Sequence, residues 1–575
     1  MSSSAKNMKL FFIIICICIV AYTLRRIPWI GIPSEPSHLF VSTWSSIEIV
    51  AKTGHIPHST QYPGINNFRI TKLDHWFRLV FFPVIFEVVG MSTQKERLDL
   101  IRTLLIPLFG VPLSGLLIVG KKVSIRMRAF TFIFLLFIGQ MYVDRTSQGL
   151  HDWGYGAMFF CFTVACLVQG IRKKNKTWFS LSIPFSIYVL ATRHTMGLIL
   201  LFCWVILAFC VVLFKIGRKN QIQYTFLTTI TLFIAIDVLY YSYLANVFSW
   251  GIIEVGRILI GQGFGGSAET ISISGTTLPK IGFSKVLSVV DRLLLVVIIG
   301  ITGLAWLPNL ASFPEKLKIS PLNLVNIPNE SDKGSVSIVI FLMLGYPVAL
   351  GIFYIFKGLP GLIGRGQQYL TLYALVAGPI LIFIFFSEAN KSPKYMRVLV
   401  VLIFVITALI SQGAFLTSSN TIEGKSAWLS QSEKHSLDNV REFVPTDARI
   451  AGSYHSVPPL VDTHPCLVGP DFSFTNKEYE TIVRGLYYNV SAQNTSEAFS
   501  ELNSRFGQIN HLIISERVTG RIGVNSEARH PGPAPESIWR SYQSVPFLNH
   551  VYSGPTHVYS NSERKNKCEV KYQYG

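Results

Sequence analysis

Long apolar runs recur through the first 415 residues, and a run of about 20 apolar residues crosses the ~30 Å hydrocarbon core of a bilayer as a helix. Half of all residues are hydrophobic and only 14% are charged, whereas a soluble domain averages about a quarter charged residues. We expect membrane-spanning helices at 10–24, 101–119, 129–143, 153–170, 178–190, 196–214, 224–247, 286–307, 336–356, 369–387 and 398–415. The sequence therefore predicts a polytopic α-helical membrane protein with about 11 transmembrane helices.

Two apolar segments allow a second interpretation. The run 10–24 follows two lysines, as a cleaved signal peptide would, but two arginines come directly after it and no A-x-A-like cleavage site is visible. We interpret it as a retained span. The segment 77–90 is short and carries Glu87, so we expect an interfacial or re-entrant helix within a long external loop at 25–100.

The net charge of +19 is distributed unevenly along the chain. Residues 1–415 carry 36 Lys and Arg against 16 Asp and Glu, while residues 416–575 carry 15 against 16. The basic residues gather in alternate short loops, at Lys121, Lys122, Arg126 and Arg128, at Arg172, Lys173, Lys174 and Lys176, at Lys215, Arg218 and Lys219, and at Lys391, Lys394 and Arg397. By the positive-inside rule these loops and the N-terminus are cytoplasmic, so the charge indicates a cell-membrane topology rather than a nucleic-acid partner.

The segment 416–575 differs in composition from the multi-span part at 1–415 and follows an odd number of spans. We therefore expect it to be an extracytoplasmic α/β domain, with strands at 511–515 and 547–552. Sequons at Asn489 and Asn494 would then be accessible to external glycosylation. Two cysteines, Cys466 and Cys568, would face an oxidising compartment, where a disulfide between them is one of two open outcomes.

Acidic residues of two external loops are the candidate catalytic groups, because a general base in a partly desolvated site can deprotonate a hydroxyl. The candidates are Glu35 in the first loop and Asp144 and Asp152 at the two ends of the next short loop. A solvated loop acid or a helix-end residue is the alternative for each of them. An intramembrane acid at Asp237 is a further hypothesis.

Cations and histidines on the same predicted face are candidate substrate-binding residues, since cations bind a lipid phosphate and the alternative is contact with lipid headgroups. The candidates are His38, His55, His151, Arg193, His194, Arg257 and Arg365. The sequence has no H-E-x-x-H or comparable zinc spacing, so we assign no protein metal site. A Mg²⁺ or Mn²⁺ ion held by carboxylates and a substrate phosphate remains open.

The first loop resembles a known family. The motif Glu35-Pro-Ser-His38-Leu39, followed by Ile47, by Gly54-His55-Ile56-Pro57 and by Tyr62-Pro63, is similar to the first loop of GT-C membrane glycosyltransferases, especially archaeal polytopic ones. The apolar strands near the C-terminus also resemble the tails of these enzymes. This sequence departs from the family pattern because it has Glu at position 35 where Asp is common, without an adjacent acid.

The resemblance implies a GT-C-like fold and transfer of a sugar, with mannose as one candidate, from a polyprenyl or dolichyl phosphate carrier. The acceptor would be a glycan or a protein on the external face, as in N-glycosylation or surface glycan assembly. Glu35 matches the first-loop acid of the family, and Asp144 and Asp152 match its second acidic loop by topology. A single displacement by one base predicts inversion at the anomeric carbon.

Two other classes of protein fit parts of the sequence. A multi-span carrier or a lipid-linked-oligosaccharide flippase would explain the spans, but carriers show internal repeats and broken midplane helices, and no repeat is evident. A membrane sensor or scaffold would explain the C-terminal domain and leave the polar first loop without a role.

Overall fold

The computed structural model describes residues 3–27, 47, 50–51, 76–147, 152–192, 194–213, 221–239, 283–307, 327–355, 366–390, 392–418, 431–452, 460, 463–464, 467–468, 476–519, 534–535 and 537–561. Its elements fall into two compact units. The first unit comprises Met1–Pro28, Thr103–Gly265 and Ile281–Ser418, and the second comprises Trp29–Arg102, Gly266–Lys280 and Ser419–Gly575.

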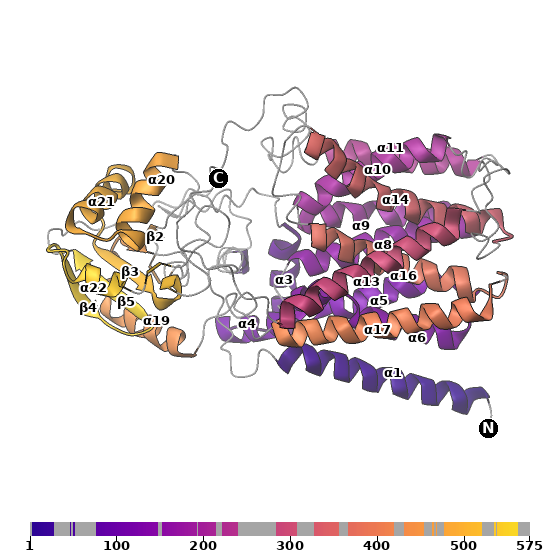
Figure 1. Ribbon diagram of the computed structural model, residues 1–575, viewed down its shortest axis with the longest axis horizontal. Helices are drawn as coiled ribbons and strands as arrows, with labels where there is room; N and C mark the ends of the chain where they lie inside the picture. Colours follow the sequence, from indigo (N-terminus) through magenta and orange to yellow (C-terminus); the bar gives the residue numbers. More distant parts are fainter. Residues whose placement is uncertain are drawn as a thin grey trace. The chain divides into compact units, whose positions relative to one another are not determined.

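The first unit is a bundle of helices, most of them long, that lie side by side (Figure 1). They are α1 (Ser3–Arg26), α5 (Ile106–Val119), α6 (Ile125–Phe137), α7 (Gln140–Ser147), α8 (Asp152–Lys173), α9 (Lys176–Thr192), α10 (His194–Leu213), α11 (Gln221–Leu239), α13 (Phe283–Trp306), α14 (Glu330–Ile355), α16 (Gly366–Phe386) and α17 (Lys394–Ser418). The apolar stretches of α8 and α16 are 94% and 89% buried, against 22% for α13. Helices α8 and α16 therefore form the core of the bundle, and α13 presents much of its apolar surface outward, as a lipid-facing helix does.

Each predicted span overlaps a helix, but two of them are divided. The range 101–119 is shared between α4 (Gln94–Thr103) and α5, and the range 129–143 between α6 and α7, which meet at a bend of 70°. Within the described ranges, five helices are long and apolar enough to cross a membrane, or six if α6 and α7 count as one span. The first unit is thus a membrane-embedded bundle, and the number of spans stays a prediction.

Loops that were predicted to share the cytoplasmic side meet at one end of the bundle. The ammonium Nζ of Lys122, between α5 and α6, lies 2.6 Å from Oδ2 of Asp332 in the first turn of α14. The guanidinium Nε of Arg172, at the end of α8, lies 3.7 Å from Oδ1 of the same carboxylate. The backbone N–H of Glu388, after α16, donates to the carbonyl oxygen of Lys122 at 3.1 Å. These contacts agree with the predicted alternation of loops, while the assignment of this end to the cytoplasm remains a prediction.

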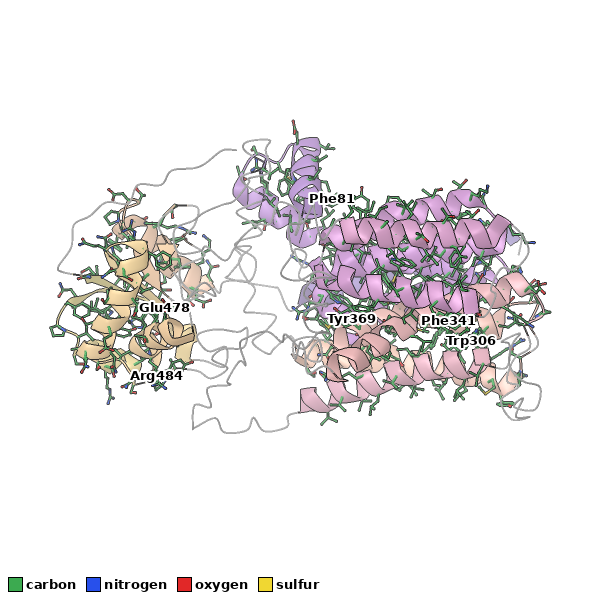
Figure 2. All side chains as sticks on the ribbon, turned by 90° about the horizontal axis from the view of Figure 1, so that it is seen from above. Phe81, Trp306, Phe341, Tyr369, Glu478 and Arg484 are labelled. Atoms are coloured by element: carbon green, nitrogen blue, oxygen red, sulfur yellow. The ribbon has the colours of Figure 1, made fainter. Side chains whose placement is uncertain are left out.

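Close packing joins the helices of the bundle. The indole N–H of Trp306 in α13 donates to the hydroxyl of Ser337 in α14 at 2.8 Å, and its ring meets Phe341 edge to face at 5.3 Å (Figure 2). Helices α10 and α14 cross so closely that a Cβ on Gly345 would lie 2.5 Å from the Cα of Cys203. Small residues permit such close approach between membrane helices, where hydrophobic burial supplies little attraction.

The segment predicted to be interfacial is a helix, α3 (Trp76–Val89), in the second unit. Its Phe82 and Phe86 are buried, whereas Val80, Val84 and Val88 are exposed. The exposed valines are spaced by four residues, so they form one stripe along the helix. An apolar stripe of this kind suits a membrane surface, and the interfacial location stays a prediction.

The C-terminal part of the second unit contains a five-stranded sheet of order β2-β1-β3-β5-β4. Its elements are α19 (Gln431–Phe443), β1 (Ile450–Gly452), β2 (Leu467–Val468), α20 (Asn476–Val483), a π-helix (Arg484–Tyr488), α21 (Ala492–Phe506), β3 (His511–Ser515), a 3₁₀ turn (Glu516–Thr519), α22 (Ile538–Tyr542), β4 (Leu548–Tyr552) and β5 (Thr556–Asn561). Strand β1 is parallel to β2 and β3, and β5 is antiparallel to β3 and β4. The α/β character and the strands at 511–515 and 547–552 are confirmed.

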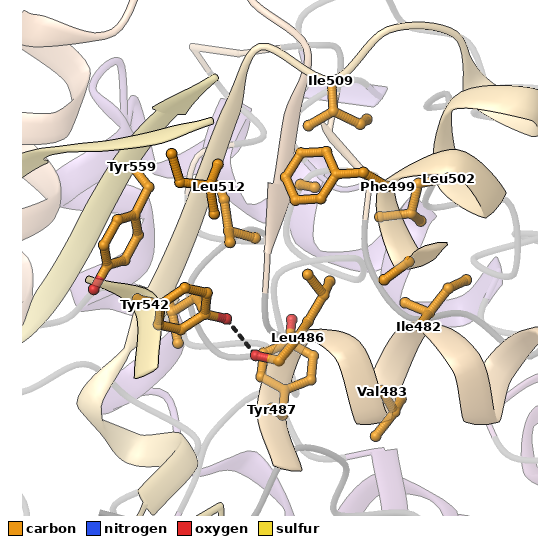
Figure 3. Packing of buried hydrophobic residues seen from close by; sticks show 14 of the residues in the cluster. Ile482, Val483, Leu486, Tyr487, Phe499, Leu502, Ile509, Leu512, Tyr542 and Tyr559 are labelled. Atoms are coloured by element: carbon orange, nitrogen blue, oxygen red, sulfur yellow. Dashed lines mark hydrogen bonds between the residues drawn. The ribbon is translucent and has the colours of Figure 1, made fainter. Parts of the chain in front are cut away.

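Alternate residues of β3 face two separate cores, as the pleat of a strand requires. Leu512 and Ile514 pack into a cluster with residues of α20 and α21, and Ile513 packs into a cluster with residues of α19. In the larger cluster the hydroxyl of Tyr542 donates to the carbonyl oxygen of Leu486 (Figure 3). Helices therefore cover both faces of the sheet, which makes this part an α/β/α sandwich.

The two sequons differ in their surroundings. Asn489 is exposed, whereas Asn494 is half-buried and its amide Nδ2 donates to the carbonyl oxygen of Asn489 at 2.9 Å. The side chain of Asn489 is therefore the more accessible of the two. Cys466 and Cys568, whose pairing was left open, lie outside the described residues.

Two histidines make the stability of the C-terminal domain depend on pH. Burial lowers the pKa of His511 below its usual value, with a contribution from the nearby His464, and burial lowers the pKa of His557 against the opposing charge of Glu516. The unfolded chain therefore binds more protons below pH ~6.5, so stability is complete above the unfolded pKa and is lost as the pH falls through it toward the folded value. We expect a lower urea midpoint at pH 5.5 than at pH 7.5, measured by pulse proteolysis of the full chain.

The variant His511→Gln provides the control for this expectation. It removes one titrating group, so the difference between the midpoints at the two pH values is expected to shrink. An unchanged difference in this variant, or a midpoint that rises at pH 5.5, would contradict the assignment.

Candidate active site

The helix break between α6 and α7 positions the acidic residue that the sequence singled out after the third predicted span. Helix α6 ends at Phe137, and Gly139 follows with φ +76°, a left-handed conformation that glycine adopts without strain. The chain turns by 70° and α7 begins at Gln140. Such a break leaves carbonyl and N–H groups without helical partners, and within a membrane other protein groups must bind them.

Side chains of two other helices bind the freed carbonyl oxygens. The Nη2 of Arg25, in the last turn of α1, donates to the carbonyl oxygen of Leu136 at 2.5 Å. The amide Nε2 of Gln412 in α17 donates to the carbonyl oxygen of Phe137 at 3.0 Å. Arg25 is fully buried, whereas Gln412 and Phe137 are partly buried.

A buried hydroxyl and a buried carboxylate bind the freed N–H groups. The backbone N–H of Gly139 donates to the hydroxyl oxygen of Ser411 in α17 at 2.8 Å. The backbone N–H of Gln140 donates to Oδ2 of Asp291 in α13 at 3.1 Å, and the hydroxyl of Ser411 donates to Oδ1 of the same carboxylate. Every backbone group named here that the break frees therefore has a side-chain partner.

Helix α7 is also held along its length. The Nε of Arg25 donates to the hydroxyl of Thr146 at 3.2 Å, and the guanidinium lies 5.9 Å from the centroid of the Tyr142 ring. The hydroxyl of Tyr142 donates to the carbonyl oxygen of Pro107 in α5 at 2.8 Å. These contacts join α7 to α1 and α5.

Asp144 lies on α7 between these contacts. Its side chain is 25% exposed, and its Oδ2 lies 3.9 Å from Nε of Arg145. Because successive residues of an α-helix are rotated by about 100°, Asp144 faces away from Tyr142 and Thr146, which lie two positions before and after it. The carboxylate is thus directed away from the α1 side of the helix.

The two ends of the second acidic loop approach each other. Helix α8 begins at Asp152, and a Cβ on Gly154 in its first turn would lie 3.4 Å from Cγ2 of Thr146 in the last turn of α7. Residues 144 and 152 therefore lie on two packed helices, joined by only a few residues. The direction of the Asp152 side chain lies outside what the structure describes, so a site shared by the two acids stays a prediction.

The other predicted site residues are placed only by the sequence. His194 begins α10, but its side chain is outside the described part, as is that of Asp237 in α11. The remaining candidates lie outside the described residues altogether: Glu35, His38, His55, His151, Arg193, Arg257 and Arg365. Their convergence with Asp144 stays a prediction.

Sequence reasoning missed the buried polar residues around the break. Asp291 lies within the predicted span 286–307 and is an intramembrane acid, which is by itself a signal of a functional site. The intramembrane acid predicted from the sequence was Asp237 instead. The roles of Ser411 and Gln412 had no sequence signal, because polar residues near the end of a span are common.

The predicted Mg²⁺ or Mn²⁺ site involves carboxylates of which Asp144 alone has a described side chain. In the described part of the chain, no group of three His, Cys, Asp or Glu side chains lies close enough to hold a metal ion. The divalent-cation site therefore stays a prediction.

Comparison of folds gives a consistent match. No protein-family model matches the sequence, and no curated protein matches it by sequence. The apo crystal structure of the oligosaccharyltransferase of Archaeoglobus fulgidus matches with a TM-score of 0.52 and 11% identity, over 96% of this chain and 74% of that chain. The chain has a GT-C fold.

Two other structures of the same archaeal protein give the same result. Its complex with Zn and sulfate has a TM-score of 0.50 at 9% identity, over 95% of this chain and 73% of that one. Its form tethered by a disulfide to an acceptor peptide containing the NVT sequon has a TM-score of 0.51 at 11% identity, over 96% and 74%. The GT-C fold predicted from the first-loop motifs is confirmed, and at this identity the likeness establishes the fold alone.

Proposed function

We propose that this chain is a membrane glycosyltransferase that moves a sugar or oligosaccharide from a polyprenyl or dolichyl phosphate carrier to a glycan or protein acceptor on the external face. The observation that carries the proposal is the match of the GT-C fold over 96% of the chain, in a bundle that fixes α7, the helix of Asp144, beside α8. The peptide-bound state of the archaeal structure favours a protein acceptor, and mannose stays one candidate for the sugar.

The proposed chemistry is a single displacement. A carboxylate, Glu35 or Asp144, accepts the proton of the acceptor, and the acceptor atom attacks the anomeric carbon. The bond from that carbon to the carrier phosphate breaks, and the bonding pair leaves with the phosphate. Arg193, His194, Arg257 and Arg365 would stabilise the negative charge on the leaving group, and one displacement inverts the anomeric centre.

Roles for the remaining candidates follow from their predicted loops. Asp152, at the start of α8, would orient the acceptor next to Asp144. His38, His55 and His151 would bind polar groups of the sugar or the acceptor. Their loops belong to the predicted external face, on which the lipid carrier would present its sugar.

One observation favours the alternative of a carrier or a lipid-linked-oligosaccharide flippase. Broken helices are common at transporter binding sites, and the span formed by α6 and α7 is broken. In transporters the freed backbone groups bind the substrate, whereas here Arg25, Gln412, Ser411 and Asp291 bind them. The break therefore fixes the position of α7, and the backbone groups named here are not available to bind a transported ligand.

An assay in detergent separates the two functions, because a carrier has no barrier to cross there and forms no covalent product. The purified full chain would be mixed with lipid-linked saccharides and glycoproteins extracted from cells that lack the gene, and with a fluorescent peptide containing Asn-Val-Thr. We expect a product of higher mass on the peptide or on the glycoproteins, detected by mass spectrometry.

The variant Glu35→Gln is expected to abolish this product while the protein still folds, as judged by size-exclusion chromatography. The matched control is Glu497→Gln, on the exposed side of α21, which should transfer at the wild-type rate. Absence of product with every acceptor would overturn the proposed function, and a fully active Glu35→Gln would overturn the role of that residue.

A further inference from the structure

Helix α7 has only eight residues, and it carries the one candidate catalytic side chain that the structure describes. Isolated helices of this length are marginal, so contacts with other elements must set the direction of α7. The residues that make these contacts therefore decide where the carboxylate of Asp144 lies.

At its first residue α7 is held by a carboxylate that is almost fully buried. Asp291 is 1% exposed, and both of its oxygens are engaged, Oδ2 by the backbone N–H of Gln140 and Oδ1 by the hydroxyl of Ser411. The same hydroxyl oxygen accepts the N–H of Gly139. A buried charge is costly unless it is bonded, so this carboxylate ties α13 and α17 to the start of α7.

At its last turn α7 is held by a guanidinium. Arg25 donates Nε to Thr146 of α7, Nη2 to the carbonyl oxygen of Leu136 in α6, and Nη1 to the carbonyl oxygen of Ala21 in α1 at 3.2 Å. The rigid planar fork of arginine joins the two arms of the bend at fixed distances. It therefore fixes the angle between α6 and α7.

We propose that Asp291 and Arg25 act as positioning residues, which together clamp both ends of α7 and thereby set the position of the Asp144 carboxylate for the transfer reaction. Neither side chain touches Asp144 in the contacts described above, and Asp144 faces away from the Arg25 side of the helix. The inference rests on the proposed function and deepens it. A misplacement of about 1 Å at a reacting group can lower a rate about 100-fold, so a weakened clamp acts on the reaction itself.

The test is a double-mutant cycle on kcat in the detergent assay. Asp291→Asn keeps the size of the side chain and loses its charge, and we expect kcat to fall about 10-fold or more while KM for the lipid-linked donor changes less than about 2-fold. Asp144→Glu keeps a carboxylate but displaces it. If Asp291 acts through the position of Asp144, the double variant loses much less than the product of the two single losses.

Further variants separate positioning from folding. Arg25→Lys keeps the positive charge but lacks the planar fork of arginine, and it is expected to lower kcat. Ser411→Ala is expected to lower kcat to a smaller extent. Both variants test the clamp if Asp291→Asn does not fold. Asp332→Asn is the matched control, since this carboxylate is equally buried but lies at the loops joined by Lys122 and contacts no residue of α7 among those described. It is expected to lower thermal stability, with kcat per folded molecule unchanged.

The outcomes distinguish this inference from the proposed function. If the wild type transfers sugar and the losses of Asp291→Asn and Asp144→Glu simply multiply, the clamp is overturned and the enzyme stands. If Asp291→Asn has the kcat of the wild type, the clamp is likewise overturned and the proposed enzyme function stands. A wild type that transfers nothing under any condition overturns both together.

Discussion

Replacement of Asp144 by asparagine is expected to lower the rate of sugar transfer by roughly 100- to 10,000-fold, the usual contribution of a general base, since Asp144 is one of the two carboxylates proposed to accept the acceptor's proton. Asparagine has nearly the size of aspartate, so the helix and its contacts should persist while the proton-accepting oxygen is lost. The carboxylate is one quarter exposed and its Oδ2 lies 3.9 Å from the nearest nitrogen of Arg145. Measurement of kcat with the lipid-linked donor in detergent gives the size of the loss.

Folding has to be measured in parallel. The melting temperature of Asp144→Asn is expected to lie within about 2 °C of the wild type, because Asp144 and its partner Arg145 are both about one quarter exposed and their charged groups are 3.9 Å apart. A variant with an unchanged melting temperature and full activity would show that Asp144 is a helix-end residue, which is the alternative that the sequence left open.

Replacement of Asp332 by alanine is expected to destabilise the bundle strongly. Asp332 is fully buried and forms ion pairs with Lys122 and Arg172. The Cζ atom of the Arg172 guanidinium lies 3.8 Å from the centroid of the Phe383 ring. Loss of the carboxylate leaves a buried guanidinium unpaired, which costs about 3–5 kcal/mol. Thermal unfolding in detergent, followed by size-exclusion chromatography, is the appropriate measurement.

Lys122→Ala supplies the comparison. The Lys122 side chain is 46% exposed, and without it Asp332 keeps Arg172 at 3.7 Å and the amide N–H of Asn329 at 3.2 Å, so Lys122→Ala is expected to lower the stability less than Asp332→Ala does. Equal losses of stability in Asp332→Ala and Lys122→Ala would show that the pairing of Arg172 matters little. A loss confined to Asp332→Ala would support the buried arrangement.

Charge and hydropathy were sufficient to place the loops around Lys122 and Arg172 at the same end of the bundle. The rule that assigned the loops around Lys122 and Arg172 to one side depends only on local composition, and the structure brings those loops together at Asp332. The strands β3 and β4 could also be predicted from local composition, since each is a short apolar stretch between polar residues. Strands β1 and β2 have only three and two residues, too few to show a pattern.

The break at Gly139 could not be predicted, because apolar residues resume at Met141 directly after Gly139 and Gln140, so that 129–143 has the hydropathy of one span. Glycine is common in straight membrane helices as well, so its presence gave no signal. The break is stable only because Arg25, Asp291, Ser411 and Gln412 converge on it from helices distant in sequence. No local pattern encodes such a convergence, and the same limit applies to the geometry of the candidate site.

The bend between α6 and α7 also limits where residues can be inserted into or deleted from the sequence. To straighten this span, the protein would have to break the hydrogen bonds that side chains of α1, α13 and α17 make to its backbone, each of which contributes about 1 kcal/mol. We therefore expect the angle of the bend to stay fixed. Insertion of one residue between Phe137 and Gln140 would rotate α7 by about 100° and turn Asp144 toward a different neighbour. Natural variants of this protein should therefore tolerate substitutions in α7 far better than insertions or deletions in the three residues that precede it.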